Sequence, residues 1–433
     1  MNSEQSSQRP NLTFLLLVFC LALVVNFGVG LKFGIAKPMA SDAEHYLDIA
    51  RSLAAGHGFY LPHGFWPQAP TMSRSPAWPF TVSLALRLFP HAAPDTVMRC
   101  LVLTLNALVA TLVGALALRL FAWRSVALLA AAAYAVYPTP LFLACQGASE
   151  TIFLLCGLAG TLLVLGKGWR PFVGMLVLGC AALSRPNFVL WVGSAGALWL
   201  VSAVWTRSLC LAGTGRRAAA ALLFLVPSLL WAARNYTVCG DFPVFSTLRG
   251  QTFYGGNNAV VADTLEYWGY WVFPDLVPGE PRMEDLARTK SEYQVDCYYY
   301  ARGKDYVRQH AFAMPRLVLG KLVRAYVPMP WKPAWGTYAI SVLRLALYGL
   351  AATGALLAWR RTVPVFRLVV GAMILTNVAT VMVFWGCARF AFAWEPFVLP
   401  WAAFAVWQVC TARSRRAISE VGRGRPRPAG TGT

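Results

Sequence analysis

Long apolar stretches separated by short polar ones dominate this sequence. A run of about 18 or more apolar residues can cross a bilayer as a helix, and several runs approach or exceed that length. The first run is too long, and too weakly basic at its front, for a cleaved signal peptide. The pattern predicts an all-α polytopic membrane protein with about 10 transmembrane helices, over residues 12–33, 97–119, 125–143, 150–166, 171–186, 188–206, 218–234, 338–358, 366–385 and 390–409.

The charged residues indicate how these helices cross the membrane. They make up only 13% of the 433 residues, yet the net charge is +20. On the predicted path, the loops and tails of one side hold many of the 38 basic residues but only Glu4 and Glu420 of the 18 acidic ones. Cytoplasmic loops carry such an excess of Lys and Arg, so both termini are predicted to be cytoplasmic. Because membrane orientation explains the basic residues, no nucleic-acid partner is predicted.

The path divides the chain into six parts. They are the N-terminus and first span (1–34), a first outer loop (35–96), the second to seventh spans (97–234), an extracytoplasmic loop region of mixed structure (235–335), the last three spans (336–410) and a basic cytoplasmic tail (411–433). In the first outer loop, residues 76–89 are too short to span and are predicted to form a juxtamembrane helix. The tail is rich in Gly and Pro and is predicted to be disordered. Its arginines either only fix the orientation or also touch anionic lipids.

Ten cysteines are scattered along the chain, mostly inside apolar runs. They form no CxxC pair and no cluster with histidine, so the sequence predicts no zinc site. Cys239 and Cys297 are the only pair in the long polar segment. Two interpretations stand: a disulfide, if this segment faces an oxidising compartment, or two buried free thiols.

The acidic residues indicate where chemistry could occur. Outside the tails and the long polar segment, and apart from Asp95, the chain contains only Asp42, Glu44, Asp48, Glu150 and Glu395. All of them lie at or near the outer face on the predicted path. An ionisable group at membrane depth is costly and usually functional. Their convergence on one side predicts a cavity that opens outward.

A polar stretch directly after the first span holds three of these acids. Ser41 and Glu44 have the spacing of a capping box, and Gly56 is a natural stop, so the pattern predicts a helix over about 42–55. One face of this helix is apolar and suited to lying on the membrane. It consists of Tyr46, Ala50, Leu53 and Ala54.

Asp42 would lie in the first turn of this helix, where the helix dipole favours an ionised carboxylate. His45 and Tyr46 would share its face. The plain alternative is that Glu44 only caps the helix and Asp42 only complements the dipole.

The first outer loop also contains a series of short motifs: Asp42-x-x-x-Tyr46, Ala50-Arg51-Ser52-Leu53, Gly56-x-Gly58 and Arg74-Ser75-Pro76-x-x-Pro79. The series resembles the first outer loop of the polyprenyl-phosphate-sugar-dependent glycosyltransferases. This is the GT-C group that includes protein O-mannosyltransferases and the lipid A aminoarabinose transferase. In that group the loop begins with an Asp, often Asp-Glu, and reaches an Arg-Pro-Pro or Lys-Pro element. This sequence departs from the pattern with Asp-Ala-Glu and Arg-Ser-Pro.

Further elements resemble the same group in the same order. Ser149-Glu150 resembles its acid at the outer start of a span, and Leu183-Ser184-Arg185-Pro186 resembles an element whose basic residue faces the lipid phosphate. The bacterial branch has a signature that is similar to Arg234-Asn235-Tyr236 with Gly255-Gly256-Asn257-Asn258, and a closing pattern that is similar to Arg389-Phe390 with Glu395-Pro396. The resemblance covers residues 1 to about 410 and is thinnest in 260–335.

The resemblance implies a GT-C-type bundle with outer-face juxtamembrane helices, and an inverting glycosyltransferase of the bacterial inner membrane. The implied donor is a polyprenyl-phosphate sugar, and the acceptor is a hydroxyl of a lipid, a polysaccharide or a protein on the extracytoplasmic face. In such chemistry a carboxylate serves as general base and arginines bind the leaving phosphate. No cofactor is predicted. Dependence on a divalent metal stays open, because only Asp42 and Glu44 offer ligands.

The resemblance also implies roles for particular residues. The catalytic role goes to Asp42, with Glu44 as second choice and Glu150 beside them. Donor-phosphate binding goes to Arg74, Arg185, Arg234 and Arg389, which Arg344 could join, and the substrate would be lined by His45, Tyr46 and Glu395. Each arginine has a plain alternative, which is snorkelling to lipid head groups. Glu150 and Glu395 could likewise only pair with arginines.

Two other functions compete with glycosyl transfer. A transporter or flippase for lipid-linked sugars would also be a multi-pass protein. Transporters, however, tend to show internal repeats and broken helices at the midplane. This sequence shows no repeat, and its acids lie at one face. A non-catalytic subunit of an envelope-assembly complex is the other alternative, and loss of the role of Asp42 would favour it.

Overall fold

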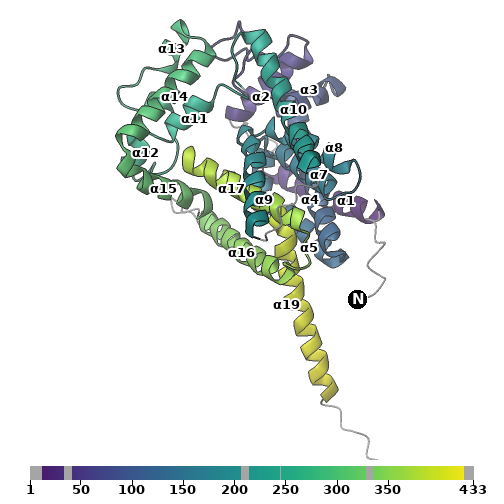
Figure 1. Ribbon diagram of the computed structural model, residues 1–433. Coiled ribbons are helices and arrows are strands. Elements are labelled where there is room, and N and C mark those ends of the chain that lie inside the picture. Colours follow the sequence, from purple (N-terminus) through teal and green to yellow (C-terminus); the bar gives the residue numbers. More distant parts are fainter. Residues whose placement is uncertain (1–11, 34–40, 206–213, 244, 328–334, 424–433) are drawn as a thin grey trace, which may run out of the picture.

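The computed structural model describes residues 12–33, 41–205, 214–243, 245–327 and 335–423. Within these ranges the chain is helical and has no β-strand, apart from one isolated bridge between Tyr60 and Pro70. Figure 1 shows a bundle of long helices with a smaller helical lobe at one end. The last helix, α19 (Glu395–Arg423), projects from the opposite end.

In the described part of the chain, six helical segments are long and apolar enough to cross a membrane. They belong to α1 (Leu12–Phe33), α4 (Pro94–Phe121), η2 and α9 (Pro186–Val189 and Leu190–Trp205), α10 (Thr214–Cys239), α16 (Trp335–Ala358) and α17 (Pro364–Val383). A seventh span results if α5 (Arg124–Ala135) and α6 (Pro138–Cys145), which are bent by 47°, count as one broken helix.

The predicted count of ten spans is not confirmed. Helices α7 (Glu150–Val164) and α8 (Arg170–Ala182) lie where spans were predicted, but they have only 15 and 13 residues. At about 1.5 Å per residue they are shorter than the roughly 30 Å hydrocarbon core of a bilayer. Helix α19 lies at the last predicted span and also falls outside the six. The sequence therefore predicted the positions of these helices better than the number that cross.

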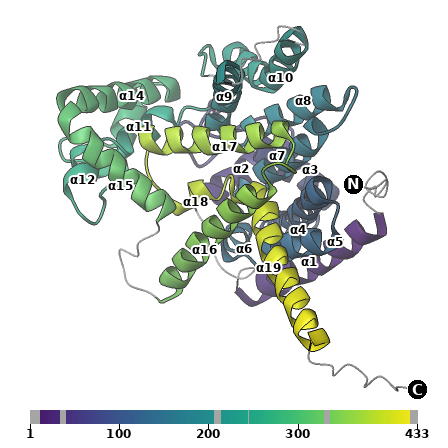
Figure 2. The same cartoon turned by 60° about the horizontal axis from the view of Figure 1, so that its bottom comes forward.

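The tail was expected to be disordered from residue 411 onward. Instead, the backbone of α19 stays helical to Arg423. Residues 424–433 lie outside the described part of the chain. At its other end α19 packs against α16, α4 and α5, as Figure 2 shows from below.

The region predicted as a mixed extracytoplasmic loop forms a helical lobe, which we call the outer lobe (residues 249–326). Its elements are α11 (Arg249–Gly255), α12 (Ala259–Asp263), η3 (Pro274–Leu276), α13 (Met283–Thr289), α14 (Glu292–Gln309), η4 (Ala311–Ala313) and α15 (Met314–Tyr326). A capping box of Ser291 and Gln294 starts α14. The lobe has its own apolar core around Val261 and Tyr299. Cys239 and Cys297 are both free thiols.

The first outer loop folds into α2 (Ser41–Ala54) and α3 (Ala77–Leu88), so both predicted helices form. Gly56 ends α2 with φ at +83°, a value that only glycine adopts easily. The side chain of Ser41 lies outside the described part, and the capping box stays a prediction. The apolar face of α2 was expected to lie on the membrane, but this was wrong. Tyr46 and Ala50 are buried in one cluster with Trp78 of α3.

Buried polar side chains join the first helices of the bundle. Asn106 of α4 donates a hydrogen bond to Asn26 of α1 at 2.7 Å, and it accepts one from Tyr134 of α5 at 2.7 Å. Inside a bilayer such groups have no water to bind, so interhelical hydrogen bonds hold helices together. This network fixes α1 against α4 and α5.

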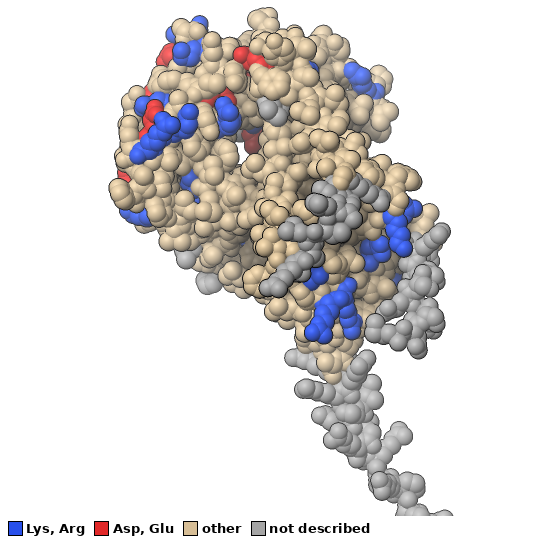
Figure 3. All heavy atoms as spheres, in the orientation of Figure 1, with Lys and Arg blue, Asp and Glu red and all other residues tan. Residues whose placement is uncertain are grey.

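The charges are distributed unevenly over the surface. In the face that Figure 3 shows, acidic atoms appear only toward the end with the outer lobe, while the opposite end shows basic atoms. The same face is hollowed between the outer lobe and the rest of the molecule, and acidic atoms are visible inside the hollow. On this face, acidic atoms therefore gather at the end with the outer lobe.

Candidate active site

Asp42 lies in the first turn of α2, at the end of the molecule that carries the outer lobe. Its carboxylate oxygens face two different arginines. Oδ1 is 3.1 Å from Nη2 of Arg74, and Oδ2 is 3.4 Å from Nη1 of Arg389, which lies 347 residues further along the chain. The Asp42 side chain is still 43% exposed. It is therefore an ion-paired carboxylate that a ligand can reach.

Glu150, the first residue of α7, is the buried counterpart of Asp42. Its side chain is 3% exposed and forms ion pairs with both Arg185 and Arg389. Arg185 lies just before η2, and Arg389 lies in α18 (Ala388–Ala391). Because Arg389 bridges Glu150 and Asp42, all these residues form one group. We call Asp42, Arg74, Glu150, Arg185 and Arg389 the open cluster.

The open cluster carries more positive than negative charge. Three guanidinium groups face two carboxylates in its ion pairs. The Nε atoms of Arg74 and Arg185 are buried and donate no hydrogen bond to any described residue. Arginine forks bind the oxygens of a phosphate well. The cluster can therefore accept an anion beside an exposed carboxylate.

His45 and Tyr46, both predicted to line the site, support Arg74. Nδ1 of His45 lies 2.7 Å from Nη2 of Arg74. Since arginine can only donate, His45 accepts this hydrogen bond as a neutral ring. Burial, and after it the charge of Arg74, lowers the pKa of His45 below its usual value of 6.5. The Tyr46 ring lies 5.7 Å from the Arg74 guanidinium carbon, and its hydroxyl is 3.5 Å from Oγ of Ser149.

Two predicted site residues lie outside the open cluster. Glu44 is exposed and forms no ion pair with its arginines. Arg234 donates hydrogen bonds to the Thr71 carbonyl oxygen and to Asn235, and it packs over the ring of Trp231. The structure therefore places Asp42, and not Glu44, beside the arginines. Arg234 instead holds the loop before Arg74 through its hydrogen bond to Thr71.

Glu395 and Arg344 form a second group instead of joining the first. Nε of Arg344 is 2.6 Å from Oε1 of Glu395, and the two side chains are 1% and 0% exposed. The hydroxyls of Tyr137 and Tyr348 each donate to Glu395 at 2.7 Å. We call these four residues the closed cluster. Glu395 has no surface with which to line a substrate, and Arg344 points to Glu395 and not to a phosphate site.

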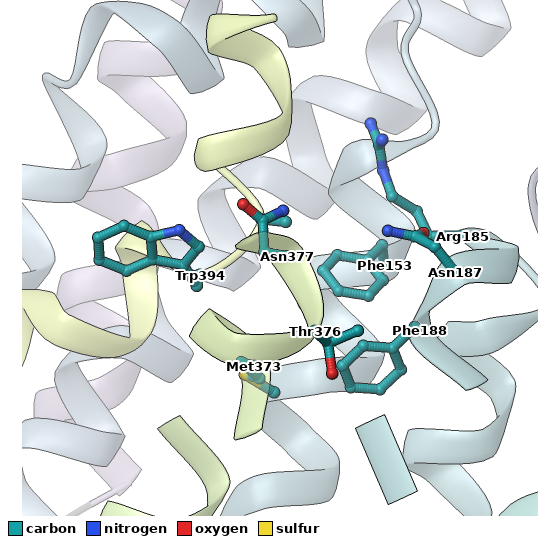
Figure 4. A pocket seen from close by; sticks show the side chains of 9 residues that line it. Phe153, Arg185, Asn187, Phe188, Met373, Thr376, Asn377 and Trp394 are labelled. Carbon is teal, nitrogen blue, oxygen red and sulfur yellow. The ribbon is translucent and has the colours of Figure 1, made fainter. Parts of the chain in front are cut away.

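A small pocket lies beside Arg185. Figure 4 shows Phe153 and Phe188 together on one side, Trp394 across the pocket, and Arg185 along one edge with its guanidinium at the far end. Most of the lining is apolar, with Asn187, Thr376 and Asn377 as polar exceptions. The pocket thus offers apolar walls next to a cationic cluster.

Sequence reasoning missed a buried lysine, Lys321 of α15. Its side chain is 1% exposed, and its Nζ donates to Oδ1 of Asn257 at 2.8 Å. Burial lowers the pKa of Lys321 to about 7. A lone lysine in the apolar stretch 317–323 was the available signal, but nothing in the sequence shows which residue it meets. Among the described residues, no group of three or more His, Cys, Asp or Glu side chains is placed to hold a metal.

No protein-family model matches the sequence, and no curated protein matches it. Among solved structures, the oligosaccharyltransferase AglB of Archaeoglobus fulgidus, in complex with an inhibitory peptide and a dolichol-phosphate, is similar with a TM-score of 0.52 and 14% identity. The similarity covers 96% of this chain and 52% of AglB. An Archaeoglobus fulgidus oligosaccharyltransferase in complex with zinc and sulfate has a TM-score of 0.50 and 13% identity, over 92% and 50% of the two chains.

ArnT of Cupriavidus metallidurans, bound to undecaprenyl phosphate, is similar with a TM-score of 0.44 and 16% identity, over 91% of this chain and 77% of ArnT. This chain spans about half the length of the archaeal structures. The two archaeal matches show that this chain shares the helical membrane-protein fold of these oligosaccharyltransferases, so the predicted fold class is confirmed.

Proposed function

From the GT-C fold we propose that this chain is an integral-membrane glycosyltransferase. It would transfer a sugar from a polyprenyl-phosphate donor to an acceptor hydroxyl on the extracytoplasmic face. One observation carries the proposal: an exposed carboxylate, Asp42, stands beside arginines whose charge is not fully balanced. The likeness to AglB, which is complexed with a dolichol-phosphate, supports a lipid phosphate as one ligand.

Arg74, Arg185 and Arg389 would bind the donor phosphate. In the donor this phosphate is a diester with one negative charge, and after transfer it is a monoester that gains a second charge. Positive groups placed where charge develops stabilise the transition state more than the bound donor. The first isoprene units of the lipid would lie against the apolar side chains beside Arg185, such as Phe153, Phe188 and Trp394. Glu150 would hold Arg185 and Arg389 in place, because it is buried and pairs with both.

Asp42 would act as the general base on the acceptor. The acceptor oxygen attacks the anomeric carbon, and the bond from that carbon to the phosphate oxygen breaks. The electron pair leaves with the polyprenyl phosphate, and the acceptor proton passes to Asp42 and then to water. A single displacement of this kind inverts the anomeric configuration. Asp42 suits this role better than Glu150, because its side chain is 43% exposed while that of Glu150 is 3% exposed.

The open cluster and the outer lobe would face the outside of a bacterial inner membrane, with both termini in the cytoplasm. The excess of basic residues at the opposite end supports this orientation. A membrane-impermeant thiol reagent added from outside should label Pro278→Cys in the outer lobe and miss Lys167→Cys between α7 and α8. The native cysteines, among them the free thiols Cys239 and Cys297, are first changed to serine. The reverse labelling pattern would contradict this orientation, because it would place the open cluster on the cytoplasmic side.

The proposed activity is tested by incubating the purified protein with a panel of polyprenyl-phosphate sugars and an envelope extract as acceptor source. We expect release of free polyprenyl phosphate from at least one donor, and no release by Asp42→Asn. The rival transporter predicts a different result in vesicles, namely movement of intact donor across the bilayer without release. That result, with no release from any donor, would overturn the proposal. The panel also identifies the sugar, and labelled product separates lipid, polysaccharide and protein acceptors.

A further inference from the structure

The connection between α17 and α18, residues 384–387, places Arg389 in the open cluster. It is a short link that begins where a long helix ends. Its neighbours come from the outer lobe, and above all from the Gly-Gly-Asn-Asn motif and from Lys321. The proposed function assigns no role to this motif or to this lysine. Both contact the end of α17.

Asn257 and Lys321 together cap the end of α17. The last carbonyl groups of a helix lack partners within the helix, and a cation is favourable there. Nζ of Lys321 donates to the carbonyl oxygens of Met382 and Val383, each at 3.3 Å. Nδ2 of Asn257 donates to the carbonyl oxygens of Val383 at 3.0 Å and Phe384 at 3.5 Å. Since Asn257 also accepts from Lys321, the two side chains form one unit.

The backbone of the connection also packs directly on the outer lobe. A Cβ atom on Gly256 would collide with the carbonyl group of Phe384, and one on Gly386 would collide with the backbone of Lys321. The amide of Gly386 donates to the carbonyl oxygen of Gly269 at 2.9 Å. Such close approach is possible only without side chains. The path of residues 384–386 is therefore set by the lobe.

Helix α15 reaches the far end of the connection as well. The hydroxyl of Tyr326 donates to Oδ1 of Asn377 at 2.6 Å, and Nδ2 of Asn377 donates to the carbonyl oxygen of Phe390 at 2.9 Å. Lys321 thus holds the residues before Arg389, and Tyr326 acts through Asn377 on the residue after it. The two contacts lie on the same helix, so a shift of α15 would move Arg389.

We propose that Lys321 and Asn257 are positioning residues, which hold residues 384–387 so that Arg389 reaches Asp42 and Glu150 together. The proposal rests on the proposed function, because it gives the outer lobe the task of setting an arginine of the transfer site. A misplacement of about 1 Å in a catalytic group can cost a factor of a hundred in rate. A group that supports Arg389 would therefore change turnover without touching the substrate.

The positional part is tested without any substrate by hydrogen–deuterium exchange of residues 384–390. Asn257→Ala and Lys321→Met should raise exchange there roughly tenfold, the effect of losing buried hydrogen bonds. Asn258→Ala is the matched control, because Asn258 is equally buried but bonds only to Tyr254, Gly255 and Val261 inside the lobe. Unchanged exchange in both test variants, or an equal rise in the control, would overturn the proposal.

The catalytic part is tested by a double-mutant cycle on polyprenyl phosphate release. Lys321→Met should lower turnover roughly tenfold in the wild-type background but only about twofold when Arg389 is already Lys, because coupled residues are not additive. Asn258→Ala should combine additively with the same Arg389 change. Additive effects for Lys321 would show that it only supports the fold. If the wild-type chain releases no polyprenyl phosphate, the proposed function fails, and the exchange experiment alone decides the positional part.

Discussion

The open and closed clusters are built from the same residue types but have different surroundings. In the open cluster, the side chains of Asp42 and Arg389 are 43% and 32% exposed. In the closed cluster, Arg344 and Glu395 are almost completely buried, and Tyr137 and Tyr348 use the remaining acceptor positions of Glu395. One arginine there meets one carboxylate, so the charges balance. The closed cluster has no room for a ligand and no charge to attract one.

This difference shows that an ion pair near the end of a predicted span is not by itself a binding site. The closed cluster connects α16 and α19 to Tyr137, in the short link between α5 and α6, and so it joins distant parts of the bundle. The open cluster connects elements too, but it keeps an exposed carboxylate and an unbalanced cation. Exposure and net charge, and not residue type, separate the two. Substitutions in the two clusters should therefore have different effects.

The largest effect is expected from Asp42→Asn. This change keeps the shape of the side chain and removes its charge, so turnover should fall by about two to four orders of magnitude while donor binding survives. Release of polyprenyl phosphate under saturating donor measures it. Glu44→Gln is the control and should cost little, because Glu44 forms no ion pair with the arginines. Loss of turnover in Glu44→Gln, with turnover retained in Asp42→Asn, would assign the catalytic role to Glu44.

The same acid-to-amide change in the closed cluster should affect stability and not chemistry. Glu395→Gln leaves Arg344 charged and without its counter-ion, and breaking a buried pair costs about 3–5 kcal/mol. The melting temperature in detergent should fall clearly, while the folded fraction keeps its turnover. An unchanged melting temperature with lost turnover would mean that the closed cluster takes part in the reaction.

A smaller effect is expected when the open cluster loses one phosphate ligand. Arg185→Ala should weaken donor binding roughly tenfold to a hundredfold, since a hydrogen bond to a charged group contributes about 1.5–3 kcal/mol. Arg234→Ala, which changes an arginine outside the cluster, should leave donor binding almost unchanged. Titration with a fluorescent polyprenyl-phosphate sugar measures both. An equal loss of donor binding in the two variants would mean that these arginines attract anionic lipids in general and do not form a specific phosphate site.

The smallest effect is expected from His45 and depends on pH. Burial, and after it Arg74, lowers the pKa of His45 in the folded chain. Between that pKa and 6.5, the unfolded chain binds more protons on His45 than the folded chain does. The stability that this residue contributes is therefore present above pH 6.5 and falls as the pH drops through 6.5 toward the folded pKa. His45→Asn keeps an acceptor for Arg74 and should remove this part of the acid sensitivity of the melting temperature, whereas an unchanged pH profile would contradict the neutral ring.

Apolar length and turn residues predicted most of the fold. The helices at 42–55 and 76–89 form nearly as expected, and Gly56 ends the first of them. Apolar length predicted spans at α7 and α8, which are apolar but shorter than the six candidate spans. The region predicted as a mixed loop is a helical lobe. Its turns depend on close contacts between distant residues, such as that of Gly256 with Phe384, which no local pattern shows.

The candidate site was predictable only in its general position at one end of the predicted spans. The sequence placed Asp42, Glu150, Arg185, Arg389 and Glu395 near the same end, and the structure brings the first four together. The sequence did not show that Glu395 pairs with Arg344, because this pairing depends on which helices are neighbours in the fold. Pairs such as Asp42 and Arg389 are separated by 347 residues, and no local rule connects them.

The central claim is that the open cluster holds the donor phosphate with the reacting sugar facing Asp42. A structure of Asp42→Asn in complex with a polyprenyl-phosphate sugar tests it most directly, because this variant should bind the donor without consuming it. We expect the phosphate oxygens within hydrogen-bond distance of Arg185 and Arg389, the lipid in the pocket between Phe188 and Trp394, and the anomeric carbon next to residue 42. A phosphate bound away from these arginines, with the sugar out of reach of residue 42, would contradict the account.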